Sequence, residues 1–151
     1  MTIINLNELA CTTGALIGID PGTKTLGIAS SDITRLIATP ITTIKRTKFS
    51  QDAEKLFTIY DNYKASAIVV GLPINMNGTY GPRTQSVKDF CNNLLSIRDL
   101  PIFFWDERLS TIAVKRGMID ADLTRKKQKK YIDKLAASYI LQGVLDRLRA
   151  K

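Results

Sequence analysis

The stretch "LIGIDPGTKTLGIASSD", residues 16–32, decides the fold because it contains two strand-forming segments joined by a short turn. "LIGID" and "TLGIASS" carry the apolar residues of buried strands, and "PGTK" between them supplies the Pro and Gly that tight turns use. The stretch therefore predicts a β-hairpin. Asp20 ends its first strand, directly before Pro21 and Gly22, and this place suits a turn residue as well as a catalytic carboxylate.

The segments after the hairpin predict an α/β fold with a mixed sheet. "LIATPITTI", residues 36–44, continues as a third antiparallel strand, and Pro40 indicates an interruption or a sheet edge. Ser50 is positioned to cap a helix that ends near Lys64. "AIVVG", residues 67–71, is apolar at every position, so both faces of this strand are apolar, as in a central strand covered on both sides.

The second half of the chain completes a strand–helix–strand unit. A loop rich in Gly, Pro and Asn, "LPINMNGTYGPR", precedes a helical apolar stripe over residues 87–95, and "PIFFW", residues 101–105, forms the next strand. Strands joined by a helix run parallel with a right-handed crossover. A last helix, "YIDKLAASYILQGVLDRL", closes a sheet flanked by helices.

Length and composition indicate one domain that folds without disulfide bonds or a structural metal. The chain has 151 residues, 44% hydrophobic and 24% charged, with no run near the eighteen or so apolar residues of a membrane span. We expect a domain over residues 15–151, after an N-terminal extension, residues 1–14, that is either floppy or an added edge strand. Since no secretory signal is recognisable, we expect a cytoplasmic protein without membrane contact, either a monomer or a homodimer.

The sequence contains two cysteines and no histidine, which excludes several kinds of chemistry. Zinc sites and Ser-His or Cys-His nucleophile pairs need residues that are missing here. Cys91 falls on the apolar side of a predicted helix, where a buried free thiol is expected. Any catalysis must therefore use carboxylates, lysines, the backbone or a metal.

The positive charge is concentrated at the C-terminal end. The net charge is +8, yet residues 1–107 hold ten basic and ten acidic residues, and residues 108–151 hold twelve basic and four acidic ones. The densest segment is "TRKKQKK", residues 124–130. A charge run can be a solvated surface, but this asymmetry favours a polyanionic partner such as nucleic acid.

Three carboxylates are positioned to converge. Asp20 closes the first strand, Asp106 and Glu107 close the last one, and ligands in open α/β sheets collect at the carboxyl ends of strands. On the last helix, Asp133 lies within about 20° of Ile140 and Val144, on the packing face. Each acid also has a plain alternative: a turn residue at Asp20, and favourable contact with a helix N-terminus at the others.

Convergent carboxylates without His or Cys suit a hard cation, Mg²⁺ or Mn²⁺. Such ions activate water and stabilise the leaving oxygen of a phosphodiester. The acids and the basic segment together predict phosphodiester hydrolysis.

The sequence resembles the YqgF family, bacterial proteins related to Holliday-junction resolvases and described as pre-16S rRNA nucleases. The resemblance lies in "GIDPGTKTLGIASSD", "IVVGLPINMNGTYGPRTQSVKDF", "DERLST" and "RKKQKKYIDKLAASYILQ", in this order over residues 16–148. It implies an RNase H-like fold, metal ligands at Asp20, Glu107 and Asp133, and action at the 5′ end of 16S rRNA or on branched DNA. Related resolvases often carry a second acid on the last helix; here Asp106 or Asp32 assists, or the second metal binds weakly.

Further basic residues are candidate contacts to nucleic acid. Lys24, in the hairpin turn, either contacts a phosphate or is simply an exposed lysine. Arg83, at the end of the loop "LPINMNGTYGPR", is placed to hold a phosphate together with backbone N–H groups at a helix start. The alternative is that this loop serves only as a turn. Arg108 orients Glu107, meets substrate or forms a surface ion pair. The basic segment offers Arg125, Lys126, Lys127, Lys129 and Lys130.

Three functions compete. The first is a metal-dependent nuclease acting on pre-rRNA or branched DNA, and the second is a ribosome assembly factor, bound to a ribosomal subunit precursor, with a vestigial site. The third, an actin-like nucleotide-binding protein, is disfavoured because one small domain lacks the second half of such a cleft.

Overall fold

A computed structural model describes residues 3–109 and 125–150, and for residues 125–133 it describes the course of the helix only. The strands are β1 (Ala15–Pro21), β2 (Thr25–Ser31), β3 (Ala38–Lys45), β4 (Ala65–Leu72) and β5 (Ile102–Asp106). The helices are α1 (Leu6–Cys11), α2 (Phe49–Asn62), α3 (Pro82–Ile97) and α5 (Arg125–Arg149), with a 3-10 turn, η1 (Glu107–Leu109).

The five strands form one mixed sheet in the order β3-β2-β1-β4-β5. The hairpin β1–β2 and the pair β2–β3 are antiparallel, and β4 runs parallel to both β1 and β5. These pairings confirm the predicted hairpin, the third antiparallel strand and the parallel strand–helix–strand unit. Strands β1, β4 and β5 therefore end at the same edge of the sheet.

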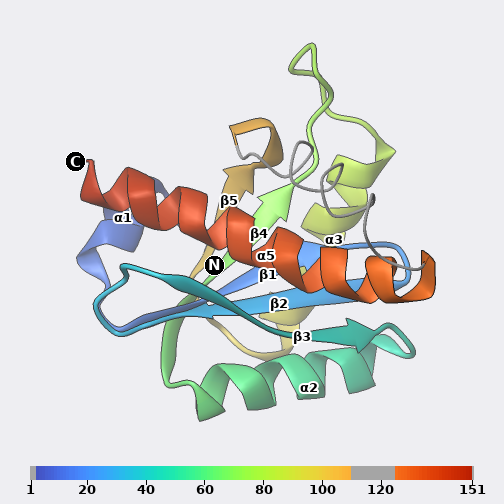
Figure 1. The fold of residues 1–151 in the computed structure, drawn as a ribbon, viewed down its shortest axis with the longest axis horizontal. Helices are drawn as coiled ribbons and strands as arrows, with labels where there is room; N and C mark the ends of the chain where they lie inside the picture. Colours follow the sequence, from blue (N-terminus) through green and yellow to red (C-terminus); the bar gives the residue numbers. More distant parts are fainter. Residues whose placement is uncertain (1–2, 110–124, 151) are drawn as a thin grey trace.

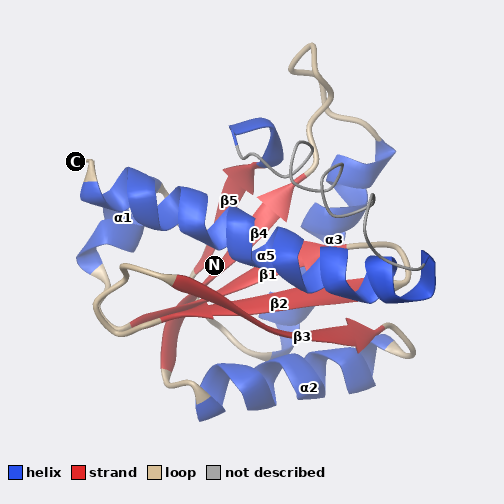
Figure 2. Cartoon of the chain, in the orientation of Figure 1, coloured by secondary structure: helices blue, strands red, loops and turns tan. Residues whose placement is uncertain are grey.

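Helices cover the two faces of the sheet (Figure 1). Alternate residues of the central strands pack in two separate cores: Leu16, Val69 and Trp105 lie under α5, whereas Ile19 and Val70 face α2 and α3. This division explains why "AIVVG" is apolar at every position. The connection between β4 and α3, residues 73–81, extends away from the sheet (Figure 2).

The edge strand β3 shows how Pro40 is accommodated. The register between β2 and β3 shifts between Ile28 and Ala29, and Ala29 lies opposite Pro40. Because proline has no N–H to donate, an edge strand with an irregular register is where it fits. The predicted edge position is thus confirmed.

Helix α2 begins slightly before the predicted cap. Its N-cap residue is Lys48 rather than Ser50, and the helix ends at Asn62. The carboxylate of Asp52, which is buried, accepts a hydrogen bond from the Thr47 backbone N–H at 3.1 Å. This contact fixes the entry of the chain, so that the first helical residue is Phe49.

Residues 3–14 pack against the domain, so the expectation of a floppy extension is wrong for the residues described. Asn5 caps α1: its side chain accepts from the Glu8 backbone N–H, and the Glu8 side chain accepts from the Asn5 backbone N–H. Leu9 is fully buried in the same hydrophobic cluster as the apolar residues of α5. The edge pairing is limited to one parallel bridge between Ile3 and Ile102. This segment therefore covers the outer edge of β5.

Two smaller expectations concern Cys91 and the membrane. Cys91 is fully buried, and this burial raises the pKa of its thiol to about 12, as expected of an inert structural cysteine. Within residues 3–109 and 125–150, no helix is both long and apolar enough to cross a bilayer.

Candidate active site

Asp20 lies at the carboxyl end of β1, on the face of the sheet that α5 covers. Leu16 on the same strand packs under α5, and residues two apart on a strand share a face. Asp20 is 8% exposed as a whole residue and is therefore buried. Desolvating a carboxylate to this degree is costly unless the charge is compensated, so this acid has more than the role of an exposed turn residue.

Glu107 reaches the same face from η1, next to β5. A Cβ atom built on Gly71 of β4 would lie 2.9 Å from Glu107 Oε1 and 2.4 Å from Ile140 Cδ1 of α5. The Glu107 side chain therefore occupies the space that a side chain at residue 71 would fill. Glycine at this position leaves room for the Glu107 carboxylate over β4, and any side chain here would force Glu107 and Ile140 to shift.

Asp20 and Gly71 are neighbours across the sheet. The parallel register pairs Ile19 with Val70, so the next residues on each strand lie side by side. With the Glu107 carboxylate over Gly71, the fold brings Asp20 and Glu107 to adjacent positions on one face. These two predicted residues come from opposite halves of the sequence.

The direction of α5 shows how far along the sheet residue 133 lies relative to Asp20. The end of α5 at Leu148 lines a hollow with Gly14, and Ala137 lies against Gly18, so α5 runs antiparallel to β1. From Ala137 back to residue 133 the helix advances about 6 Å, and from Gly18 to Asp20 the strand advances about 6.6 Å. The helix turn that carries residue 133 thus comes level with Asp20.

Among the side chains that the structure describes, no three Asp, Glu, His or Cys side chains form a group arranged to hold a metal ion. The Asp133 side chain lies outside that set, as do the side chains of Arg125, Lys126, Lys127, Lys129 and Lys130. The donors at Asp20 and Glu107 are nevertheless of the right type, because Mg²⁺ and Mn²⁺ prefer carboxylate oxygen. The glycine at residue 71 leaves them the necessary room.

Two arginines hold the turn that follows Asp20. Arg83, at the start of α3, donates from Nη2 to the Pro21 carbonyl at 2.7 Å, and Arg46 donates from Nη1 to the Gly22 carbonyl at 2.6 Å. The Arg46 guanidinium also lies over the Phe90 ring, 5.0 Å from its centroid. The sequence predicts Arg83 either as a phosphate contact or as part of a plain turn loop; the structure shows that its guanidinium binds the backbone beside Asp20. Arg46 is a residue that the sequence patterns did not indicate.

Lys24 is exposed in the same turn, and its carbonyl accepts from the Arg46 backbone N–H at 2.9 Å. The turn is thus tied to the end of β3, while the Lys24 side chain lies at the surface beside the candidate site. The structure is compatible with either predicted role of Lys24.

Arg108 pairs with Asp106 instead of Glu107. Its guanidinium donates to both Asp106 oxygens, with Nη2 to Oδ2 at 2.7 Å, and Nη1 lies 3.4 Å from the carbonyls of Asn75 and Met76. These hydrogen bonds hold the pKa of Asp106 below its usual value. The ion-pair alternative is therefore confirmed, with the added role of tying the β4–α3 loop to the β5 end. Because both oxygens of Asp106 already accept hydrogen bonds from Arg108, Asp106 is poorly suited to act as a fourth metal ligand.

Asp32 lies at the opposite end of the sheet and cannot assist Asp20. Its Oδ1 accepts from the backbone N–H groups of Leu36 and Ile37, at 2.8 and 2.9 Å. Asp20 pairs with Gly27, five residues before Asp32 on the neighbouring strand, which corresponds to about 16 Å. The suggestion that Asp32 acts as a further ligand is wrong.

The order of the strands and the long helix over their hairpin define an RNase H-like fold. Among solved structures, Thermus thermophilus RuvC in complex with a Holliday junction substrate is similar, with a TM-score of 0.55 and 14% identity over 90% of this chain and 96% of that one. A structure of RuvC alone gives a TM-score of 0.50. These similarities confirm the predicted fold.

The chain belongs to the RuvX family, described as Holliday junction resolvase, whose sequence pattern matches residues 14–147. A Cereibacter sphaeroides protein named "Putative pre-16S rRNA nuclease" is 56% identical over 136 residues, 90% of this chain and 85% of the relative. A Phenylobacterium zucineum protein of the same name is 51% identical over 149 residues, covering 97% of this chain and 96% of the relative. The predicted family is thereby confirmed.

Proposed function

We propose that this protein is a metal-dependent endonuclease that hydrolyses phosphodiester bonds in structured nucleic acid, with the 5′ end of pre-16S rRNA as its substrate. The observation that carries the proposal is the position of the Glu107 carboxylate over Gly71, beside the buried Asp20. Relatives that share more than half of the aligned residues carry the name "Putative pre-16S rRNA nuclease", which supports the proposed substrate.

In the proposed site, Asp20, Glu107 and Asp133 hold Mg²⁺ or Mn²⁺. The bound metal supplies an activated water and stabilisation of the leaving oxygen. The turn after Asp20 is kept in place by Arg46 and Arg83, so that the carboxylate is fixed before substrate binds. Lys24 and the segment Arg125, Lys126, Lys127, Lys129 and Lys130 bind the phosphate backbone without reading its sequence.

The test is a cleavage assay in Mg²⁺ or Mn²⁺ on a pre-16S rRNA fragment and on a four-way DNA junction. We expect Asp20→Asn and Glu107→Gln each to lower the cleavage rate by at least about 100-fold. Loss of a residue that merely hydrogen-bonds to a metal ligand already lowers metal affinity or activity about 10–100-fold, and these two residues are the proposed ligands themselves. Asp89→Asn, an exposed acid on α3 that accepts from Gln85, is the matched control and should cleave normally.

The substrates distinguish the competing functions. Preference for the rRNA fragment supports the proposal, whereas preference for the junction would make the protein a resolvase, as the family description suggests. Equal cleavage by the wild type and both carboxylate variants would refute the carboxylate mechanism. Binding of RNA without cleavage by the wild type would instead indicate an assembly factor.

A further inference from the structure

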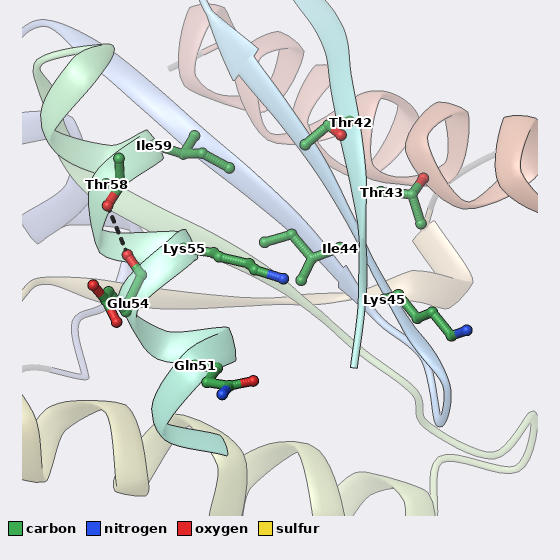
Figure 3. Close-up of a pocket in the computed structure, with 9 residues that line it drawn as sticks. All are labelled: Thr42, Thr43, Ile44, Lys45, Gln51, Glu54, Lys55, Thr58 and Ile59. Atoms are coloured by element: carbon green, nitrogen blue, oxygen red, sulfur yellow. Dashed lines mark hydrogen bonds between the residues drawn. The ribbon is translucent and has the colours of Figure 1, made fainter. Parts of the chain in front are cut away.

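Two surface features lie outside the candidate carboxylates: a hollow beside β3 and the loop between β4 and α3. The hollow, of about 600 Å³, lies between β3 and α2 (Figure 3), and both Glu54 and Lys55 line it, so its charges select no one kind of ligand. The loop, residues 73–81, instead presents large side chains to solvent, with Tyr80 61% and Met76 88% exposed. Proteins stack nucleic-acid bases on exposed aromatic rings of this kind.

Hydrogen bonds hold the β4–α3 loop in one shape. The Asn75 N–H donates to the Thr79 carbonyl at 3.0 Å, and Asn75 Nδ2 donates to Thr79 Oγ1 at 3.0 Å. The Thr84 hydroxyl donates to the Pro73 carbonyl and accepts from the Gly81 N–H, so it joins the two ends of the loop. A loop that is already ordered loses little conformational entropy when it binds a ligand.

Two arginines anchor this loop beside the candidate metal ligands. Arg83, three residues after Tyr80, donates to the carbonyl of Pro21, the residue that follows Asp20, at 2.7 Å. Three residues of chain span at most about 10 Å, which keeps Tyr80 near the turn after Asp20. From η1, which begins with the other ligand, Arg108 Nη1 lies 3.4 Å from two carbonyl oxygens of the loop.

The Tyr80 ring has a cation beside it. Lys88 Nζ on α3 lies 4.3 Å from the ring centroid. Of the acids in this region, Asp106 is paired with Arg108, and Asp89 is exposed and accepts a hydrogen bond within α3. An aromatic face next to a positive charge suits a nucleotide, because the base stacks on the ring while the cation attracts the phosphate.

We propose that Tyr80 and Lys88 bind an unpaired nucleotide next to the cleaved bond, with its base stacked on the Tyr80 ring and its phosphate beside the Lys88 ammonium. A base inside a duplex is stacked between its neighbours, so only an unpaired base is available to the ring. The loop thereby selects substrates in which paired and unpaired nucleotides meet. This inference rests on the proposed nuclease function and specifies its substrate.

The test uses the full-length protein and a hairpin RNA with a single-stranded 5′ extension, with Ca²⁺ in place of Mg²⁺ to prevent cleavage. The fluorescent base 2-aminopurine replaces each of the first few unpaired bases in turn, and stacking on Tyr80 should quench its fluorescence at one of these positions. A blunt hairpin with the same stem measures binding without an unpaired base. The extended hairpin made of DNA forms a further arm, and quenching that depends on Tyr80 in either nucleic acid supports the site.

Tyr80→Ala should abolish the quenching and weaken binding of the extended hairpin roughly tenfold, the usual order for loss of one base–aromatic stack. Binding of the blunt hairpin should not change, and Tyr80→Phe should keep the wild-type behaviour because it keeps the ring. Lys88→Gln should lower the slope of log K against log salt by about one phosphate contact. Tyr63→Ala, at a 44% exposed tyrosine that ends α2, is the matched control and should behave as the wild type does.

Absence of quenching at every labelled position would overturn the proposal. Equal loss of affinity for the blunt and extended hairpins in Tyr80→Ala, or the same loss in Tyr63→Ala, would overturn it as well. Quenching that depends on Tyr80, in a protein that cleaves no RNA in Mg²⁺, would support the nucleotide site and refute the nuclease function. Cleavage in Mg²⁺ that Tyr80→Ala leaves unchanged, without quenching, would refute the nucleotide site alone.

Discussion

At the scale of single residues, Gly71 determines whether Glu107 can reach its place. A methyl group at residue 71 would lie 2.4 Å from Ile140 Cδ1 and 2.9 Å from Glu107 Oε1, both closer than van der Waals contact permits. Both side chains, or the strand that carries residue 71, must then shift. The candidate site thus depends on the absence of a side chain as much as on its carboxylates.

For Gly71→Ala we expect a destabilisation of about 1–3 kcal/mol, as overpacked cores show, together with a large loss of cleavage activity. Urea unfolding measures the first effect and the rate per folded molecule the second. Leu56→Ala in α2 is the control, because removing this fully buried side chain costs about 2–5 kcal/mol without touching Glu107. If Gly71→Ala kept full activity per folded molecule, the placement of Glu107 would be irrelevant to function.

Arg83 gives a second prediction at this scale. Arg83→Met removes the hydrogen bond to the Pro21 carbonyl while keeping most of the side chain's length. We expect the concentration of Mn²⁺ needed for half-maximal activity to rise, because the turn no longer fixes Asp20. Thermal unfolding should change little.

Direct titration of Mn²⁺ into the protein, followed by electron paramagnetic resonance, separates this effect from RNA binding. Unchanged Mn²⁺ affinity with weaker RNA binding would show that Arg83 acts only on phosphate. Asp89→Asn again serves as the unaffected reference.

At the scale of structural elements, the β2–β3 connection is held by Asp32. Hydrogen bonds from the Ile37 N–H, the Thr34 hydroxyl and the Leu36 N–H lower the pKa of the Asp32 carboxyl to about 2. Arg35, at a positive φ of 59°, donates from Nε to the Gly14 carbonyl at 2.7 Å and from Nη2 to Thr12 Oγ1 at 2.7 Å. The connection is therefore tied to the segment before β1.

The pKa of Asp32 predicts a pH-dependent contribution to stability. Because the pKa is lower in the folded than in the unfolded protein, the ionised carboxylate stabilises the fold above about pH 4, and this contribution disappears as the pH falls toward 2. Asp32→Ala should melt at a lower temperature than the wild type at pH 6, and the difference should shrink on acidification. A difference that stays constant between pH 6 and pH 2 would show that the ionised carboxylate contributes nothing.

At the scale of the whole molecule, charge is distributed unevenly along the chain. Since residues 1–107 are neutral overall, the excess of positive charge comes from the C-terminal third. The basic segment opens α5, the helix whose turn at residue 133 comes level with Asp20. Nucleic acid bound through this segment would therefore be close to the candidate active site.

Replacing Lys126, Lys127, Lys129 and Lys130 together by Gln should weaken RNA binding and flatten its salt dependence. Each lost phosphate contact reduces the slope of log K against log salt by about 0.7–0.9, so loss of four contacts reduces it by roughly 3. Filter binding between low and high salt measures the slope. An unchanged slope would show that residues 126–130 do not contact the phosphates of the nucleic acid.

The sequence by itself determined the hairpin, the central strand and the strand–helix–strand unit, because hydrophobic periodicity and Gly-Pro turns act over short distances. That Asp20 and Glu107 lie close to the ends of β1 and β5 could be predicted for the same reason. Only the tertiary structure decided that Glu107 lies over Gly71, that Arg108 reaches the β4–α3 loop at Asn75, and that Arg46 holds the turn after Asp20. These contacts join residues on different strands and helices, and side-chain packing between such elements leaves no periodic signal in the sequence.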